Sequence, residues 1–153
     1  MSILNGVLNK LGIRAAAPAA RSPLSIFLLD DDTRRHEWFA KRFARDHLDI
    51  ASDVRSAIRL LSTNVYDAIF LDHDLLPEHY EMDSLEDEQR TGYAVAAWLA
   101  AHPDLQPASM ILVHTRNADA AMKMVEELRR SGRQAQYLPY PLLIQKIKKG
   151  WLR

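Results

Sequence analysis

Short apolar runs alternate with segments of helical periodicity over most of the chain. The segments 24–30, 66–72 and 109–115 have continuously apolar centres, as expected for strands that are buried on both faces of a parallel sheet. Weaker strand candidates lie at 48–52 and 135–140. The pattern therefore predicts five strands.

Five helices are predicted between and after these strands, because apolar residues recur there at helical spacing. They cover residues 32–47, 53–64, 91–103, 117–132 and 142–153. The candidate N-terminal caps are Asp32 or Thr33, Asp53, and Asn117 or Asp119. Strands that alternate with helices are joined by right-handed crossovers, so we expect an α/β fold in which helices cover both faces of a parallel sheet.

The first 23 residues differ from the rest of the chain. Apolar residues recur at helical spacing within residues 2–12, which predicts a short amphipathic helix, and the Ala/Pro-rich stretch that follows is typical of a linker. The helix is interpreted either as a loosely held tail or as a docking element for a protein partner. The sequence thus divides into residues 1–23 and one domain over residues 24–153.

Composition excludes several classes of function. The chain has 20 basic and 20 acidic side chains and a formal net charge of zero, so we expect no bulk electrostatic attraction to nucleic acid or membranes. No apolar run approaches the roughly 20 residues of a membrane span. The absence of cysteine rules out disulfides, thiolate zinc sites and cysteine nucleophiles, and it agrees with a cytoplasmic location.

Ionisable residues follow the three strongest strands. The first strand ends in Asp30-Asp31-Asp32, the third in Asp72-His73-Asp74 and the fourth in His114-Thr115-Arg116-Asn117. A single such residue need only mark where a buried strand meets water, or cap the next helix. Three such clusters at the carboxyl edge of one sheet, where α/β proteins bind ligands, favour a functional site.

The aspartates are candidate metal ligands. If the first and third strands are neighbours, Asp30, Asp31 and Asp72 lie close together, and their charges repel unless a cation neutralises them. An all-oxygen site suits Mg²⁺, or Mn²⁺ if a histidine joins. Asp74 is a possible fourth ligand, whereas Asp32 is interpreted as a helix cap.

His73 and His114 are the candidates for proton transfer, because histidine titrates near neutral pH. On adjacent strands they would act as base and acid on opposite sides of a phosphorus atom, although either could instead be structural. Thr115 and Asn117 are candidate phosphate ligands, since Asn117 lies near a helix N-terminus. The remaining histidines are interpreted as structural: His36, His47, His79 and His102.

These residues resemble the response-regulator receiver domain, in which an Asp pair follows strand one, an Asp follows strand three and a Thr follows strand four. The resemblance implies a receiver/flavodoxin-like, doubly wound, five-stranded parallel sheet of order 2-1-3-4-5, with Mg²⁺ on the acidic residues and Asp72 as the phosphorylated residue. Leu138 stands where receivers have a lysine that couples phosphorylation to rearrangement; the nearest lysines are Lys146 and Lys148. This departure argues against ordinary phospho-acceptor switching.

The sequence more closely resembles a divergent branch, the cyclic-phosphate-processing receiver-like family. The stretches that carry this resemblance are LLDDDTRRHEWF, FLDHDL, TGYAVAAWLAAHP and ILVHTRNADAAMKM. They imply a metal-dependent phosphoesterase that hydrolyses cyclic phosphates on nucleotides or RNA ends, with Asp72, His73 and His114 at the catalytic centre. The alternative is a non-catalytic binding, signalling or assembly module that docks through its N-terminal helical extension.

The stretch 75–90 is acidic and lacks the glycines usual in the family's loop. It is interpreted either as a solvated loop or as a lid over the site. Because its negative charge would repel an RNA backbone, the sequence favours a short or nucleotide-sized substrate over a long RNA.

Overall fold

The structure of the 153-residue chain is a computed structural model that describes residues 21–75, 90–107 and 109–152. This part forms a five-stranded parallel sheet of order β2-β1-β3-β4-β5, which confirms the predicted fold and strand order. The strands are β1 (Ser25–Leu29), β2 (His47–Ala51), β3 (Ala68–Leu71), β4 (Met110–Val113) and β5 (Ala135–Tyr137). The helices are α2 (Thr33–Arg42), α3 (Val54–Thr63), α5 (Gly92–Ala101), α6 (Ala118–Arg130) and α7 (Tyr140–Lys148). The predicted helix at 2–12 and most of the stretch 75–90 lie outside the described residues.

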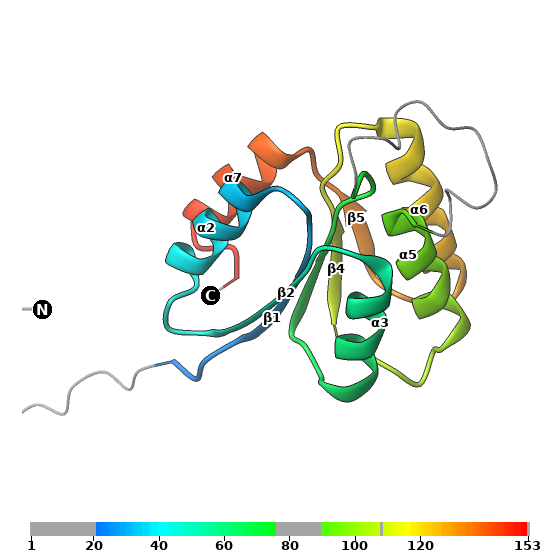
Figure 1. Ribbon diagram of the computed structural model, residues 1–153, viewed down its shortest axis with the longest axis horizontal. Helices are drawn as coiled ribbons and strands as arrows, with labels where there is room; N and C mark the ends of the chain where they lie inside the picture. The colour runs from blue at the N-terminus through cyan, green and yellow to red at the C-terminus, as the bar shows by residue number, and fades with distance from the viewer. Residues whose placement is uncertain (1–20, 76–89, 108, 153) are drawn as a thin grey trace, which may run out of the picture.

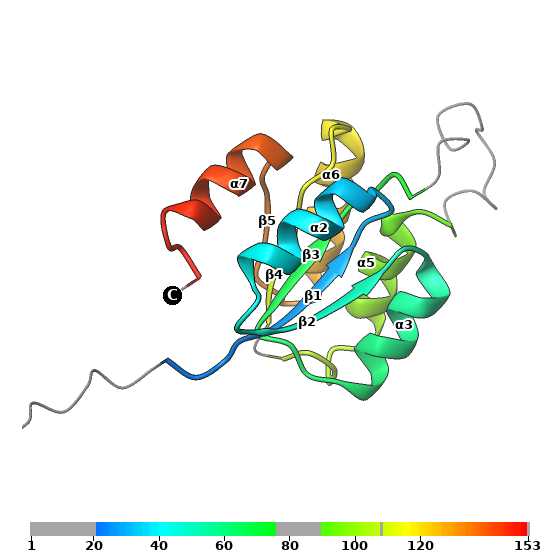
Figure 2. The ribbon, with the colours of Figure 1, turned by 60° about the vertical axis from the view of Figure 1, so that its left-hand side comes forward.

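The helices cover both faces of the sheet, with α2 and α7 on one face and α3, α5 and α6 on the other (Figure 1; Figure 2). Successive residues of each strand therefore point into different layers of the core. In β1, Ile26 and Leu28 pack into the layer under α2 and α7, whereas Phe27 and Leu29 pack into the other layer. Both layers are apolar, which explains why the strands are continuously apolar.

The strand register places three strand ends side by side. Leu29 of β1 pairs with Leu71 of β3, which in turn pairs with Val113 of β4. Backbone hydrogen bonds continue one residue further: the N–H of Asp72 donates to Leu29 O at 2.9 Å, and the N–H of His114 donates to Leu71 O at 3.0 Å. The polar residues that follow these strands thus share one edge of the sheet.

Several predicted boundaries are wrong. Helix α2 ends at Arg42 rather than continuing to His47, because the chain turns and His47 begins β2 beside β1. Helix α7 begins at Tyr140 rather than at residue 142, and β5 correspondingly ends at Tyr137. Pro141 explains the early start of α7, since the first turn of a helix tolerates a residue that has no N–H group.

Three of the described helices begin at predicted caps. The side chains of Asp32, Asp53 and Asn117 accept hydrogen bonds from backbone N–H groups at the starts of α2, α3 and α6. Gly132, with a φ of +88°, lies in the turn just beyond α6, where the left-handed conformation suits glycine. Among the described residues, no helix is both long enough and apolar enough to cross a membrane.

Candidate functional site

Three ionisable residues converge at the carboxyl edge of the sheet. Asp30, Asp72 and His114 directly follow β1, β3 and β4, and each can offer a ligand atom such that all three atoms lie within 4.8 Å of one another. All three residues are buried. His114 Nε2 and Asp30 Oδ2 form a hydrogen bond of 2.8 Å within this acidic cluster. The pairing of β1 with β3, on which the predicted site depended, is confirmed.

Arg35 places a positive charge beside the two carboxylates. Its Nη1 lies 3.1 Å from Asp30 Oδ2 and 3.6 Å from Asp72 Oδ2, and its guanidinium lies over the ring of Tyr140. Neither Arg35 nor Tyr140 was predicted to belong to the site. The spacing of Arg35 from the Asp32 cap, about one helical turn, is a signal that could have found it. No local signal singles out Tyr140.

Burial changes the protonation of the acidic cluster. Burial, together with repulsion from Asp30, raises the pKa of Asp72 to about 8 from an ordinary value of 3.8. Burial would also raise the pKa of Asp30, but the hydrogen bond from His114 and nearby positive charge outweigh it and lower that pKa. Burial lowers the pKa of His114, although Asp30 opposes this shift. At neutral pH we therefore expect Asp30 to be ionised and Asp72 to hold a proton until a cation replaces it.

The donor set of the acidic cluster fits a divalent cation. Two carboxylates and an imidazole suit Mn²⁺, and carboxylates with water suit Mg²⁺. Among the described residues, His114 Nδ1 has no hydrogen-bond partner although the atom is buried. Protein groups thus leave this imidazole incompletely satisfied. Because the Arg35 guanidinium already contacts both carboxylates, a cation that binds them must displace it.

A second group of predicted residues lies on the rim of the acidic cluster. His73 Nδ1 is 2.8 Å from Asp74 Oδ1, and the Thr115 hydroxyl donates to Asp74 Oδ2 at 3.3 Å. The same hydroxyl accepts a hydrogen bond from the Asn117 N–H at 3.2 Å. Asp74 thus connects the residues that follow β3 with those that follow β4.

A cavity of about 200 Å³ opens at this edge. Its lining residues are Asp31, Asp32, Arg34, Arg35, Asp72, Asp74 and Arg116. Asp31 therefore faces the same cavity as Asp72 and Asp74, although it is not one of the three converging ligands. Burial, followed by the charge of Asp30, raises the pKa of Asp31. Arg116 was not predicted to have a role, and it adds a cation to this acidic cavity.

The start of α5 packs against the backbone of the site. The N–H of Gly92 donates to His73 O at 2.9 Å. A Cβ atom added to Gly92 would overlap the carbonyl oxygen of Asp72, so a side chain does not fit there. The Thr-Gly-Tyr stretch at 91–93 therefore has a steric role: its glycine allows α5 to approach Asp72 and His73 closely.

The other histidines contact backbone or lie in regular structure. His36 Nε2 is 2.6 Å from Asp30 O, so this residue supports the end of β1 from α2. His102 Nδ1 is 2.7 Å from Trp98 O. His47 begins β2 rather than lying in a helix or loop, and His79 is outside the described residues.

A protein-family model accounts for this combination of residues. Residues 25–130 match the model of the cyclic-phosphate processing receiver domain. The chain belongs to this family. The resemblance stated from four sequence stretches is thereby confirmed, and the family match includes the acidic cluster and its rim. Tyr140 and Leu138 lie beyond the matched residues. No curated protein sequence matches the chain.

Solved structures with the same fold have low sequence identity to this receiver-family chain. A response regulator protein from Burkholderia pseudomallei, with a phosphorylated aspartic acid, calcium ion and citrate, is 23% identical with a TM-score of 0.59; the match covers 81% of this chain and 64% of that one. A CheY-like receiver domain protein from Methanospirillum hungatei JF-1 is 18% identical, with a TM-score of 0.59 and coverage of 84% and 94%. A CheY-like receiver domain from Methylobacillus flagellatus is 20% identical with a TM-score of 0.58, and the match covers 84% of this chain and 98% of that one. These likenesses establish the receiver fold.

Proposed function

We propose that this chain is a metal-dependent phosphoesterase that hydrolyses a cyclic phosphate on a nucleotide or RNA end. The observation that carries the proposal is the convergence of Asp30, Asp72 and His114 at a buried strand edge. Carboxylates that are costly to bury and repel one another are typical of sites that bind a cation or substrate. The family description supplies the class of substrate.

The acidic cluster supplies the metal ligands in this proposal. Asp30 and Asp72 would hold Mn²⁺ or Mg²⁺, and His114 would add a nitrogen ligand. Asp31 and Asp74, which face the neighbouring cavity, would be further carboxylate ligands. The bound cation would polarise a phosphoryl oxygen and lower the pKa of water. His114 is fully buried and bonded to Asp30, so it suits a ligand or positioning role better than proton exchange with a substrate.

His73 is the residue that we assign to proton transfer. When its Nδ1–H donates to Asp74, Nε2 becomes the basic nitrogen that accepts a proton from water. Thr115 donates to the other oxygen of the same carboxylate and so keeps Asp74 in place. A carboxylate that orients an imidazole is a common arrangement for a general base.

Arginines supply the phosphate contacts in this proposal. Arg35 and Arg116 line the acidic cavity, and guanidinium groups match the geometry of phosphate oxygens. Thr115 and Asn117, the phosphate ligands predicted from the sequence, bond to Asp74 and to the first turn of α6. We propose that they position the rim, while Arg116 contacts the substrate.

A non-catalytic binding or assembly module is the second candidate, and one observation favours it. Without a metal, the Arg35 guanidinium compensates the charge of Asp30 and lies beside Asp72, as expected of a receiver fold that has lost its chemistry. Docking would then fall to residues 2–12, which lie outside the described residues. Turnover separates the candidates, because a docking module can retain a metal ion and only the phosphoesterase opens a cyclic phosphate.

The deciding experiment is to incubate the purified full chain with a nucleoside 2′,3′-cyclic phosphate and Mn²⁺ or Mg²⁺, and to follow ring opening by chromatography. We expect metal-dependent ring opening that is lost in Asp72→Asn. Asp104→Asn, at an exposed position after α5, is the matched control and should keep full activity. Circular dichroism checks the folding of each variant. No ring opening with either metal, in folded protein, would overturn the phosphoesterase in favour of the binding module.

A further inference from the structure

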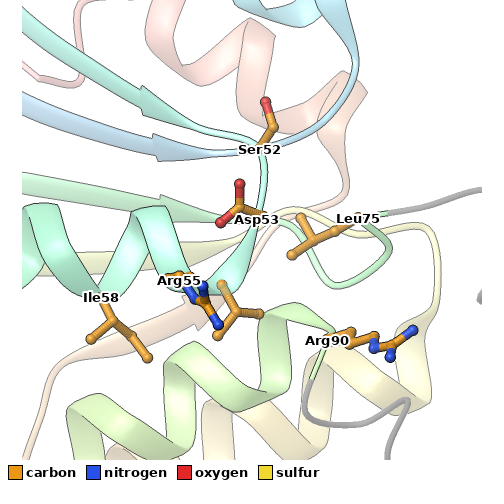
Figure 3. A pocket seen from close by; sticks show the side chains of 7 residues that line it. Ser52, Asp53, Arg55, Ile58, Leu75 and Arg90 are labelled. Carbon is orange, nitrogen blue, oxygen red and sulfur yellow. The ribbon is translucent and has the colours of Figure 1, made fainter.

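A second, larger cavity lies at the same edge of the sheet. Its volume is about 650 Å³, within the range of about 300–1,000 Å³ that is typical of small-molecule sites. The cavity lies between the N-terminal turn of α3 and the chain that enters α5 (Figure 3). Its lining residues are Ser52, Asp53, Val54, Arg55, Ile58, Leu75 and Arg90. None of them belongs to the acidic cluster or its rim.

The strand register places this cavity beside the acidic one. Ser52 follows β2 as Asp30 follows β1 and Asp72 follows β3, so these three residues are neighbours along the sheet edge. With neighbouring strands about 4.8 Å apart, the backbone of Ser52 lies about 10 Å from that of Asp72. One short segment borders both cavities, since Asp74 lines the acidic cavity and Leu75 lines the larger one.

The larger cavity combines an aliphatic wall with two guanidinium groups; its one carboxylate, Asp53, accepts hydrogen bonds from Ser56 with both oxygens. Val54, Ile58 and Leu75 form the wall. In the described part of the chain, Arg55 and Arg90 have no carboxylate within ion-pair distance. A flat ligand with hydrogen-bond acceptors suits this combination, because guanidinium planes stack on rings and their N–H groups donate to acceptors. A purely apolar ligand would leave both cations unused, and a sugar would leave the aliphatic wall unused.

We propose that this cavity is a base subsite, which receives the nucleobase of a nucleotide whose phosphate lies in the acidic cavity. The proposal rests on the proposed phosphoesterase function and adds to it the place where the base of the nucleotide substrate binds. The aliphatic wall covers one face of the base, and Arg55 and Arg90 contact its other face and its acceptor edge. Because the two cavities adjoin, a single nucleotide fills both.

The test compares two ligands by isothermal titration calorimetry in the presence of Mn²⁺. One is a nucleoside 3′-monophosphate; the other is the 3-phosphate of 1-O-methylribose, which lacks the base. We expect the nucleotide to bind at least about tenfold more tightly. The double variant Arg55→Ala, Arg90→Ala should abolish this ratio. Arg59→Ala, exposed one turn further along α3 and outside the cavity, should preserve it.

The outcomes separate this inference from the proposed function. Equal affinity for the two ligands, no measurable nucleotide binding, or an unchanged ratio in the double variant would overturn the base subsite. If the wild type binds the nucleotide at least about tenfold more tightly than the base-free phosphate but opens no cyclic phosphate, the subsite is retained and the phosphoesterase is rejected. Conversely, ring opening at the same kcat/KM with a base-free cyclic phosphate would support the phosphoesterase and reject the subsite.

Discussion

Arg35 determines the charge balance of the acidic cluster. Its side chain is only 16% exposed, and it contacts Asp30 directly and Asp72 at a longer distance. An exposed ion pair contributes little to stability, but removing one partner from a largely buried pair leaves an uncompensated charge and costs about 3–5 kcal/mol. The guanidinium therefore has two effects: it stabilises the metal-free protein and competes with any cation for the carboxylates.

Replacement of Arg35 tests this competition. We expect Arg35→Met to lower the metal-free stability by about 3–5 kcal/mol and to enlarge the rise in Tm on adding Mn²⁺, because the cation no longer displaces a guanidinium. Scanning fluorimetry with and without Mn²⁺ measures both effects. Arg45→Met, at an exposed position after α2 and outside the acidic cavity, is the matched control. A metal-induced rise no larger than that of the wild type would show that Arg35 does not compete.

Asp72 gives the site a pH dependence whose sign is fixed by its raised pKa. The folded protein holds the Asp72 proton up to about pH 8, whereas the unfolded chain releases it near pH 3.8. Folding stability therefore falls as pH rises through this window, by at most about 1.4 kcal/mol per pH unit. We expect Asp72→Asn to raise the free energy of unfolding of metal-free protein, relative to the wild type, increasingly from pH 5 to about pH 8. Urea unfolding in EDTA over this range measures the difference, and a constant difference would contradict the prediction.

At the scale of elements, the site depends on how closely α5 approaches the end of β3. Gly92 hydrogen-bonds to His73 O and leaves no room for a side chain next to the Asp72 carbonyl. The first turn of α5 thus fixes the backbone of two predicted site residues without contributing a functional group.

Replacement of Gly92 should lower both the folding stability and the affinity of the acidic cluster for a metal ion. We expect Gly92→Ala to lower the free energy of unfolding by at least about 1–3 kcal/mol, because the methyl group forces the Asp72 backbone to move. Mn²⁺ affinity should fall as well, as measured by calorimetry. Ala101→Gly, at the exposed end of α5, costs up to about 1 kcal/mol through helix propensity alone and should leave Mn²⁺ affinity unchanged. Normal Mn²⁺ affinity in folded Gly92→Ala protein would contradict the prediction, because it would show that the metal site does not depend on this close packing.

The hydrophobic pattern was sufficient to predict β1, β3 and β4, because these strands are buried on both faces. The edge strands β2 and β5 are partly exposed, and their patterns were correspondingly weaker. Strand-end chemistry similarly identified Asp30, Asp72 and His114, which the sheet brings together. The contribution of Tyr140 was not predictable in the same way, because it depends on how α7 packs over the sheet and a local pattern does not specify that packing. For Arg35, the spacing from the Asp32 cap was the one local signal. The early start of α7 was missed because QYLPY reads equally well as a strand.

At the scale of the whole molecule, the balance of charge bears on substrate length. A formal net charge of zero gives the chain no long-range attraction to a polyanion. Apart from the metal ion, the only positive charges that the proposals use are those of a few arginines at one edge of the sheet. An RNA end and a mononucleotide would therefore make similar contacts.

This balance predicts a weak dependence of RNA binding on salt. We expect an oligoribonucleotide with a terminal phosphate to bind no more than a few times tighter than the mononucleotide. Its log Kd should change with log salt by a slope of about 1 to 2, as for one to three phosphate contacts. Fluorescence anisotropy at increasing KCl concentrations measures the slope, with a basic RNA-binding domain as reference. A slope above about 4 would reveal an extended RNA-binding surface.

The position of Arg35 bears on the order in which the proposed enzyme folds and binds its metal ion. Because Arg35 supplies a positive charge beside Asp30, we expect the chain to fold without a metal. If the chain is the proposed enzyme, its synthesis and its activation would be separate events. Newly made protein would be folded but inactive, and its activity would follow the supply of free cation. In such a protein, the Arg35 guanidinium occupies the metal site until a metal ion displaces it.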